Sequence, residues 1–214
     1  MSEKILVVAN GEPPSFELLQ NLFKDHQQLV AVDGGLSTCL KYGFEPDLLM
    51  GDFDSISKEI RSEFTHVPQI HIPDQNKSDL EKTLSYLFDS HPEVITVCGA
   101  LGKRLDHTLV NIHLLTRYPE ELKFASDTET CFALKKSSLL SCQIGQTLSL
   151  IPVSTHVSGV ITHGLKWELQ GDELSKDFLS LSNVCLERTV SITFEAGDLI
   201  VCMGYTQGDL TKIS

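Results

Sequence analysis

The 214-residue sequence lacks features that would each indicate a different class of protein. No apolar run approaches membrane-spanning length, so the sequence predicts no transmembrane helix. Basic residues are few, with 17 Lys and Arg against 29 Asp and Glu and a formal net charge of −12, which argues against a protein that grips nucleic acid through its phosphates. An anionic substrate would need local help from a bound cation, a helix N-terminus or a few well-placed basic side chains.

Recognisable cysteine motifs are also missing. The sequence has six cysteines but no C-x-x-C pair and no nearby histidine at the spacing of a zinc site. Most of these cysteines lie inside apolar stretches, where cysteine behaves as a small hydrophobic residue. The apolar run near the N-terminus is too short for a signal peptide, and we therefore expect a protein of the reducing cytoplasm.

The first half of the sequence alternates short β-branched runs with longer segments that have apolar residues at helical spacing. Several short runs are continuously apolar, as expected for parallel strands covered on both faces. The order of the segments is typical of an open, doubly wound, mostly parallel α/β domain, which we assign to residues 1–127. The predicted strands are Lys4–Ala9, Gln28–Val32, Asp47–Met50, Gln69–Ile72, Val94–Cys98 and Leu122–Ala125, and the predicted helices are Ser15–His26, Leu36–Tyr42, Lys58–Phe64, Ser78–Ser90 and His107–Tyr118.

After about Thr128 the helical periodicity disappears. The remaining sequence has short strand-like runs broken by Gly, Pro and polar turns, and Glu195–Asp198 has the character of a hairpin turn between the last two runs. We therefore expect a small all-β sandwich domain over residues 128–214. Its clearest strand candidates are Thr147–Pro152, Gly159–Thr162, Val190–Phe194 and Leu199–Met203.

Carboxylates cluster directly after the predicted strands of the first half. In open α/β sheets the ligand crevice lies beyond the carboxyl ends of the strands, so these side chains are expected to meet there. That many like charges repel one another, and a hard divalent cation such as Mg²⁺ is the economical explanation. A single Asp after a strand is often only a helix cap or turn residue, so the prediction depends on the whole set. The set is Asp33, Asp52, Asp54, Asp74, Asp79 and Asp106.

Three basic residues lie in the same loops as these carboxylates. Lys77, Lys103 and Arg104 could contact phosphate oxygens, the arginine as a fork and the lysines as point charges. Alternatively they neutralise neighbouring Asp residues, because surface ion pairs are common. The segment Gly99–Arg104 lacks the spacing of a P-loop, although a Gly-rich turn before a helix can still offer backbone N–H groups to a phosphate.

Taken together, these segments resemble the thiamine pyrophosphokinase family. The Gly-Asp-Phe-Asp-Ser motif combined with the Lys-x-Asp and Arg-x-Asp-His loops is specific, whereas any one of them alone would not be. The sequence departs from bacterial members at Val184, where they commonly have Glu. The matching pieces run in the family's order along nearly the whole chain and are Asp33–Gly35, Gly51–Ile56, Asp74–Asp79, Gly99–His107, Gly164–Trp167 and Leu181–Asn183.

The resemblance implies an enzyme that transfers a diphosphate from ATP to the hydroxyl of thiamine, giving thiamine diphosphate and AMP. It also implies a homodimer with a shared active site, in which ATP binds the α/β domain and thiamine lies between that domain and the partner's β-domain. The implied Mg²⁺ ligands are Asp52, Asp54 and Asp79, and the implied catalytic set adds Lys77 and Arg104. The residues implied at the nucleotide and thiamine sites are Asp33, Gly34, Asp74, Gly102, Arg104, Asp106, His107, Trp167, Ser182 and Asn183.

The residues themselves agree with this class of reaction and leave alternatives open. Phosphoryl-type transfer needs in-line positioning and charge neutralisation, which a carboxylate-held Mg²⁺ supplies together with Lys and Arg. One alternative is a pyrophosphokinase for another heterocyclic alcohol, such as a hydroxymethylpterin, which the departure at Val184 motivates. Another is a non-catalytic sensor of thiamine or a nucleotide. The only Trp, Trp167, is either a core residue or a flat surface that stacks on the thiazolium ring.

Overall fold

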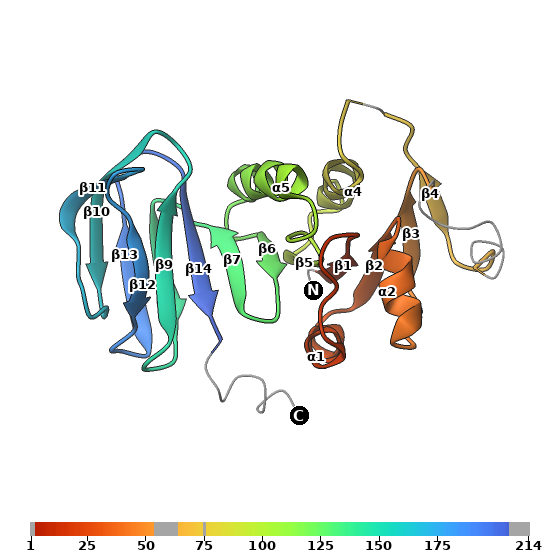
Figure 1. The fold of residues 1–214 in the computed structure, drawn as a ribbon, viewed down its shortest axis with the longest axis horizontal. Helices are drawn as coiled ribbons and strands as arrows, with labels where there is room; N and C mark the ends of the chain where they lie inside the picture. Colours follow the sequence, from red (N-terminus) through yellow and green to blue (C-terminus); the bar gives the residue numbers. More distant parts are fainter. Residues whose placement is uncertain (1–2, 54–63, 75, 206–214) are drawn as a thin grey trace. The chain divides into compact units, whose positions relative to one another are not determined.

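The computed structural model describes residues 3–53, 64–74 and 76–205 (Figure 1). The chain divides into two compact units, one of residues 1–114 with 124–127 and one of residues 115–123 with 128–214. The first unit is α/β and the second is antiparallel β, so the fold class predicted from the sequence is confirmed. Asp54 and most of the helix predicted at Lys58–Phe64 lie outside the described residues. None of the described helices is long and apolar enough to cross a bilayer.

The sheet of the first unit is built mainly from parallel strands. In the described residues its order is β6-β5-β1-β2-β3-β4. β1 pairs in parallel with both β2 and β5, and β3 pairs in parallel with β2 and β4. Each observed strand matches a predicted one, with ends that differ by at most one residue. The strands are β1 Lys4–Val8, β2 Gln28–Val32, β3 Leu48–Gly51, β4 Gln69–His71, β5 Val94–Cys98 and β6 Leu122–Ala125.

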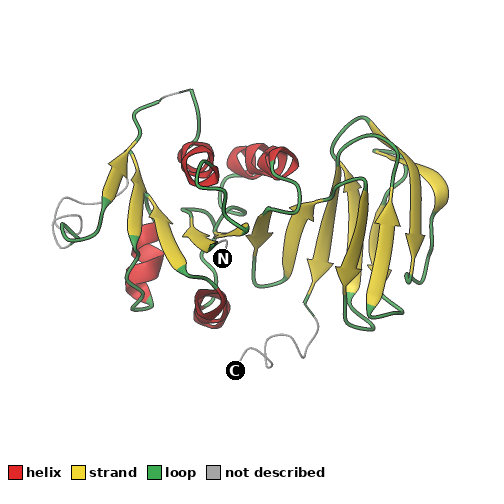
Figure 2. Ribbon diagram, turned by 180° about the vertical axis from the view of Figure 1, so that it is seen from behind, coloured by secondary structure: helices red, strands yellow, loops and turns green. Residues whose placement is uncertain are grey.

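Helices cover both faces of this sheet (Figures 1 and 2). α1 (Phe16–Asp25) and α2 (Gly35–Lys41) pack apolar side chains on the face that presents Leu6 and Leu29. α4 (Asp79–Phe88) and α5 (Leu105–Arg117) lie on the opposite face. Two predicted helix starts act as caps in the structure, because the hydroxyls of Ser15 and Ser78 each accept a hydrogen bond from a first-turn backbone N–H.

The strand order reverses between β1 and β5, which makes this the topological switch point of the sheet. Ligands of open α/β sheets bind at such a point, beyond the carboxyl ends of the strands. The turns after β1 and β5 touch there, with Gly11 N donating to Gly99 O at 2.7 Å. A Cβ on Gly99 would lie 2.5 Å from the carbonyl oxygen of Ala9, so only glycine allows this close approach of the two turns.

The second unit is a sandwich of two antiparallel sheets. One has the order β12-β9-β14-β7 and the other β11-β10-β13-β8. Side chains from both sheets, among them Phe132, Leu150, Val160 and Ile192, form the buried core between them. The strands are β7 Glu129–Ala133, β8 Ser137–Ser141, β9 Thr147–Pro152, β10 His156–His163, β11 Gln170–Ser175, β12 Ser180–Val184, β13 Thr189–Thr193 and β14 Leu199–Gly204.

One turn in the sandwich differs from its prediction. The residues Glu195–Asp198 were expected to close a hairpin, but β13 pairs with β10 and β8 while β14 pairs with β7 and β9. The turn therefore carries the chain from one sheet to the other, and the hairpin prediction is wrong. A Gly-containing turn between two apolar runs is compatible with both outcomes, because the partner of each strand is chosen by packing and not by the turn alone.

Candidate active site

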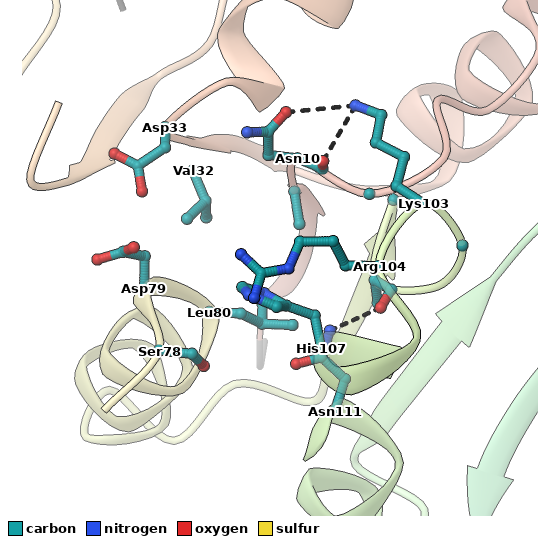
Figure 3. A pocket seen from close by; sticks show the side chains of 15 residues that line it. Asn10, Val32, Asp33, Ser78, Asp79, Leu80, Lys103, Arg104, His107 and Asn111 are labelled. Atoms are coloured by element: carbon teal, nitrogen blue, oxygen red, sulfur yellow. Dashed lines mark hydrogen bonds between the residues drawn. The ribbon is translucent and has the colours of Figure 1, made fainter. Parts of the chain in front are cut away.

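A cavity of about 440 Å³ lies in the first unit (Figure 3). It is lined by the turns that follow β1, β2 and β5 and by the first residues of α4 and α5. The cavity therefore occupies the topological switch point of the sheet, where the fold places ligands. Its volume lies within the range of small-molecule sites.

Three carboxylates, which we call the acidic cup, meet at one side of this region. Asp33 follows β2, Asp52 follows β3, and Asp79 is the first residue of α4. One carboxylate oxygen of each lies within 4.8 Å of one oxygen of each of the others. Figure 3 shows Asp33 and Asp79 facing one another at the edge of the cavity. The structure thus brings together two of the three predicted metal ligands with Asp33, and the third, Asp54, lies outside the described residues.

The backbone around Asp33 is shaped to hold its carboxylate in the acidic cup. Asp33 has a φ of +44° and Phe53 a φ of +63°, a region that non-glycine residues seldom adopt and that costs roughly 1–3 kcal/mol per residue. Phe53 N donates to Asp33 Oδ1 at 3.0 Å. A Cβ on Gly51 would lie 2.0 Å from Asp33 Oδ1, so the carboxylate occupies the space that a side chain at position 51 would need.

Burial and like charges raise the pKa of Asp33 to about 7. Loss of solvation is the largest cause, and the charges of Asp79 and Asp52 act in the same direction, whereas the hydrogen bond from Phe53 N opposes them. Binding of a proton or a cation therefore stabilises the acidic cup electrostatically. Its hard oxygen donors fit Mg²⁺, because oxygens bound to one such ion at 2.0–2.1 Å lie about 3–4 Å apart.

A buried lysine that the sequence analysis did not single out supports Asp79. Lys82 Nζ lies 2.6 Å from Asp79 Oδ1 and donates to the carbonyl oxygen of Ile72 at 3.1 Å. Lys82 is 5% exposed and the Asp79 side chain 33%, so the lysine end of the ion pair is held out of water. The i,i+3 spacing of Asp79 and Lys82 on one helix is the sequence signal that could have revealed this contact.

Basic groups line another part of the cavity. Lys103, which has a φ of +55°, donates from Nζ to Asn10 O at 3.1 Å and to Asn10 Oδ1 at 3.4 Å (Figure 3). Arg104 donates to both carboxylate oxygens of Asp106, from Nε at 3.1 Å and from Nη2 at 2.5 Å. These hydrogen bonds are the main cause that lowers the pKa of Asp106 to about 2.

Two lining asparagines were absent from the predicted site residues. Asn10 follows β1, and its side chain fills the space beside Gly34, where a Cβ would lie 2.5 Å from Asn10 Cγ. Asn111, on α5, donates from Nδ2 to Ala100 O at 2.6 Å and so fixes the turn after β5. The signal for Asn10 was its position directly after the first strand, at the same sheet edge as the predicted carboxylates.

The other predicted residues of the first unit divide between the cavity and its surroundings. Gly102 and His107 line the cavity together with Arg104. Among the described lining residues there is no Asp74, Lys77 or Asp106. Asp74 lies in the exposed loop before α4, where its Oδ1 accepts hydrogen bonds from Asn76 N and Nδ2 at 2.9 and 3.1 Å.

The predicted thiamine residues lie together in the second unit. Trp167 is 57% exposed, so it is not a core residue of the sandwich. Asn183 is 2% exposed, accepts from Trp167 N at 3.1 Å and donates to Trp167 O at 2.7 Å. Its amide therefore holds the backbone that presents the indole ring. Ser182 has a φ of +51°, and its backbone N donates to Ser149 Oγ at 2.9 Å.

Family models match most of the chain. The model described as "Thiamin pyrophosphokinase, catalytic domain" matches residues 19–126, half of the chain and most of the first unit. The model described as "Thiamin pyrophosphokinase, vitamin B1 binding domain" matches residues 137–199, within the sandwich.

Individual relatives agree with these models. "Thiamine pyrophosphokinase 1" of Oryza sativa subsp. japonica is 32% identical over an alignment of 175 residues that covers 73% of this chain and only 65% of the rice protein's length. "Thiamine pyrophosphokinase" of Bacillus subtilis is 26% identical over 206 residues, covering 92% of this chain and 96% of that protein.

Solved structures share the fold. A crystal structure of thiamine pyrophosphokinase from Bacillus subtilis superposes with a TM-score of 0.84 at 23% identity, over 94% of this chain and 99% of that chain. The yeast thiamin pyrophosphokinase structure gives a TM-score of 0.83 at 18% identity, over 95% and 86% of the two chains. At these identities the structures show the fold alone. The family model that matches half of the sequence shows the family as well. This chain belongs to the thiamin pyrophosphokinase family.

Proposed function

We propose that this chain is a Mg²⁺-dependent thiamine diphosphokinase, which transfers the β,γ-diphosphate of ATP to the hydroxyl of thiamine and releases AMP. The observation that carries the proposal is the acidic cup of Asp33, Asp52 and Asp79 at the edge of a cavity at the switch point of the sheet, in a chain of this family. Open α/β sheets bind nucleotides at such a point, and hard carboxylate oxygens bind Mg²⁺.

The acidic cup holds the metal in this proposal. Asp52 and Asp79 are the ligands, Asp33 supports them directly or through water, and Asp54 completes the predicted set. When bound, Mg²⁺ neutralises the charge of the nucleotide phosphates and orients them. Lys82 keeps Asp79 pointed at the acidic cup through the 2.6 Å ion pair.

The turn after β5 binds the phosphates. Arg104 offers a planar fork and Lys103 a point charge, and Gly102 allows the backbone to approach closely. His107, which lines the cavity, and Gly34, which lies beside Asn10, belong to the nucleotide site in this proposal, and Asp106 orients Arg104. Lys77 and Asp74, in the loop before α4, reach the phosphates from the other side of the acidic cup in this proposal.

The protein contributes to this reaction mainly by positioning the two substrates. The thiamine hydroxyl attacks the β-phosphorus of ATP in line with the leaving AMP, and the charge that develops on the phosphate oxygens is stabilised by groups already in place. The buried Asp33 and the paired Lys82 contribute because they need no reorganisation when the substrate arrives.

Thiamine binds the second unit in this proposal. The exposed ring of Trp167 stacks on the thiazolium cation, and Ser182 contacts the substrate. Asn183 acts indirectly, because its amide is engaged with the backbone of Trp167. The active site is shared between the subunits of a homodimer, and the protein is cytoplasmic, as its free cysteines suggest.

Product analysis tests the reaction. The purified chain is incubated with Mg²⁺, ATP and thiamine, and AMP and thiamine diphosphate are measured by chromatography. We expect the two products in equal amounts, and none when EDTA replaces Mg²⁺. Turnover of a hydroxymethylpterin but not of thiamine would identify the pterin as the substrate. Tight thiamine binding without AMP release at any Mg²⁺ concentration would favour a sensor.

Light scattering tests the shared site. We expect the mass of a dimer, and mixing an Asp79→Asn chain with a Trp167→Ala chain is expected to restore part of the activity, because mixed dimers contain one intact shared site. A fully active monomer would contradict this arrangement.

A further inference from the structure

Two cysteines that are far apart in the sequence are directly opposed in the second unit. Cys131 lies on β7 and Cys202 on β14, and the antiparallel register of these strands pairs the two residues. The Cys131 thiol donates to Cys202 Sγ at a distance of 3.1 Å. Both cysteines are free in the structure.

The hydrogen bonds of the ladder show which kind of pair this is. Leu134 N donates to Leu199 O, and Tyr205 N donates to Thr128 O, so the register positions at both ends of the ladder are hydrogen-bonded pairs. Hydrogen-bonded and non-hydrogen-bonded pairs alternate along an antiparallel ladder, which makes Cys131 and Cys202 a non-hydrogen-bonded pair. The Cα atoms of such pairs lie about 4.5 Å apart, which is within the range that a disulfide bond spans.

The pair can be reached by a small reagent through one of its members. Phe132 and Val201, the neighbours in sequence, point into the sandwich core, so the two thiols lie on the other face of the sheet. Cys131 is buried at 6% exposure, whereas Cys202 is only partly buried. The hydrogen bond from Cys131 lowers the pKa of Cys202, which makes the more exposed sulfur also the better nucleophile.

We propose that Cys131 and Cys202 form a site of oxidative modification, at which a low-molecular-weight disulfide converts the two thiols into a cross-strand disulfide bond. The Cys202 thiolate attacks one sulfur of the reagent, forming a mixed disulfide and releasing the first small thiol. Cys131 then attacks the sulfur of Cys202 and displaces the second small thiol. Two protein thiols are oxidised, one reagent disulfide is reduced to two thiols, and the two protons leave with these products.

A metal site is the competing use of the same groups. A carboxylate oxygen of Glu129 lies within 4.8 Å of both sulfurs, so Glu129, Cys131 and Cys202 could offer three ligands to zinc. Two thiolates bound to one tetrahedral zinc at 2.3 Å lie about 3.8 Å apart. The observed sulfur separation of 3.1 Å is shorter and closer to bond formation. In a reducing compartment such a bond would be transient, as for other redox-responsive disulfides.

Peptide mapping tests the proposal on the full chain. The reduced protein is incubated with oxidised glutathione, alkylated after denaturation and digested with trypsin, which releases Cys131 in residues 124–135 and Cys202 in residues 189–212. We expect these two peptides to be linked, with a combined mass lower by two hydrogen atoms, and the number of alkylated cysteines to fall from six to four.

A second pair of neighbouring thiols supplies the matched control. Cys142 and Cys185 also interact through a side-chain hydrogen bond, and they fall in other tryptic peptides, residues 137–166 and 177–188. C142S is expected to retain the link between the first pair, whereas C131S and C202S are each expected to abolish it. The variant with Ser at position 131 is expected to stop at a mixed disulfide of Cys202 with glutathione.

Three outcomes would overturn the proposal. The first is a link between Cys142 and Cys185 while Cys131 and Cys202 remain alkylated. The second is a link between two chains through Cys202, seen as a dimer on a non-reducing gel. The third is zinc in the purified protein that protects Cys131 and Cys202 from alkylation until a chelator removes it, which would assign the pair to metal binding.

Discussion

The acidic and basic sides of the cavity are built differently. On the acidic side Asp33 is 5% exposed, Lys82 has a side-chain exposure of 4% and Asp79 one of 33%, so these groups are buried or half-buried. Arg104 and Asp106 have side-chain exposures of 68% and 63%, so their ion pair is surrounded by water. The fold therefore holds these carboxylates in place and leaves Arg104, the proposed phosphate ligand, on the surface.

The difference between the two sides has an electrostatic reason. Carboxylates that hold a divalent ion must converge, which costs energy that only tight packing and a buried counter-charge can offset. An exposed arginine paired with Asp106 is stabilised little by that pair and can exchange it for a phosphate at small cost. Substitutions on the acidic side are thus expected to affect chemistry and stability, and those on the basic side to affect nucleotide binding.

The largest expected effect is on the acidic cup. Asp79→Asn keeps the shape of the side chain and removes the charge, so we expect the rate of AMP release to fall by about 10³-fold at saturating ATP, with little change in thiamine affinity. Asp106→Asn is the matched control, an exposed carboxylate whose loss is expected to change the maximal rate by less than about tenfold. Equal losses in both variants, measured by the product assay, would remove the distinction between the two sides.

The next largest effect is expected from the buried lysine. Lys82→Met preserves the apolar stem and leaves Asp79 without its counter-charge, which we expect to lower the free energy of unfolding by about 2–3 kcal/mol. This value is below the range for fully enclosed pairs, because the Asp79 side chain is 33% exposed. Urea unfolding in EDTA measures it.

The control for this prediction is an exposed lysine. Lys176→Met removes the partner of Asp177 in a pair that is almost fully exposed, and it is expected to change stability by no more than about 0.5 kcal/mol. Saturating Mg²⁺ should recover part of the Lys82→Met loss. A Lys82→Met protein as stable as the parent would mean that the buried pair does not stabilise the acidic cup.

A smaller effect is expected on the basic side. Arg104→Ala removes the fork that is proposed to bind phosphate, and we expect the KM for ATP to rise by about 10- to 100-fold with an unfolding free energy within about 0.5 kcal/mol of the parent. Arg104→Lys keeps the charge without the bidentate geometry and should give an intermediate KM. A loss of stability with an unchanged KM would place Arg104 among the structural residues.

The last prediction is a pH dependence of stability that has opposite signs on the two sides. The pKa of Asp33 is raised to about 7, so the folded chain holds a proton that the unfolded chain releases near pH 4. In EDTA, Asp33 is therefore expected to make stability fall as the pH rises from about 4 to 7, by at most about 1.4 kcal/mol per pH unit. The pKa of Asp106 is lowered to about 2, so its contribution is present above pH 4 and disappears as the pH falls toward 2.

Urea unfolding between pH 5 and pH 8 measures this dependence. Asp33→Asn should remove the slope, and Asp106→Asn should leave it unchanged in this range. The stabilisation by Mg²⁺ should grow with pH, because the ion replaces the proton in the acidic cup. A slope that survives in Asp33→Asn would assign the titration to another group.

The parallel half of the fold could be predicted from the sequence because its signals are local. Apolar runs such as Val94–Cys98 and the cap residues Ser15 and Ser78 indicate strands and helix starts without knowledge of their partners. The sandwich was harder, because β11 (Gln170–Ser175) and β12 (Ser180–Val184) carry many polar residues and are identified as strands only by their pairing. The mistaken hairpin at Glu195–Asp198 has the same cause.

The residues of the candidate site could likewise be predicted only in part from the sequence. Motif order brought out Asp52 and Asp79, and the rule that strand ends meet at one sheet edge predicted that carboxylates such as Asp33 would gather there. Lys82 and Asn10 were missed although both had a local signal, because the i,i+3 spacing of a charge pair and a polar residue after a strand do not by themselves reveal burial or the contact between two turns. Asn183 resembled a direct ligand in sequence, and only the structure reveals its two hydrogen bonds to the backbone of Trp167.

The carboxylate of Asp33 in the acidic cup restricts which residues can stand at position 51. Its missing side chain leaves the volume that Asp33 Oδ1 occupies, since even an alanine methyl group would lie 2.0 Å from that oxygen. Its φ of +139° also lies where other residues are strained. In a library with all twenty amino acids at this codon, selection for growth that depends on the proposed activity should return glycine alone, and the same selection would tolerate many residues at Gly43, whose Cβ position is open.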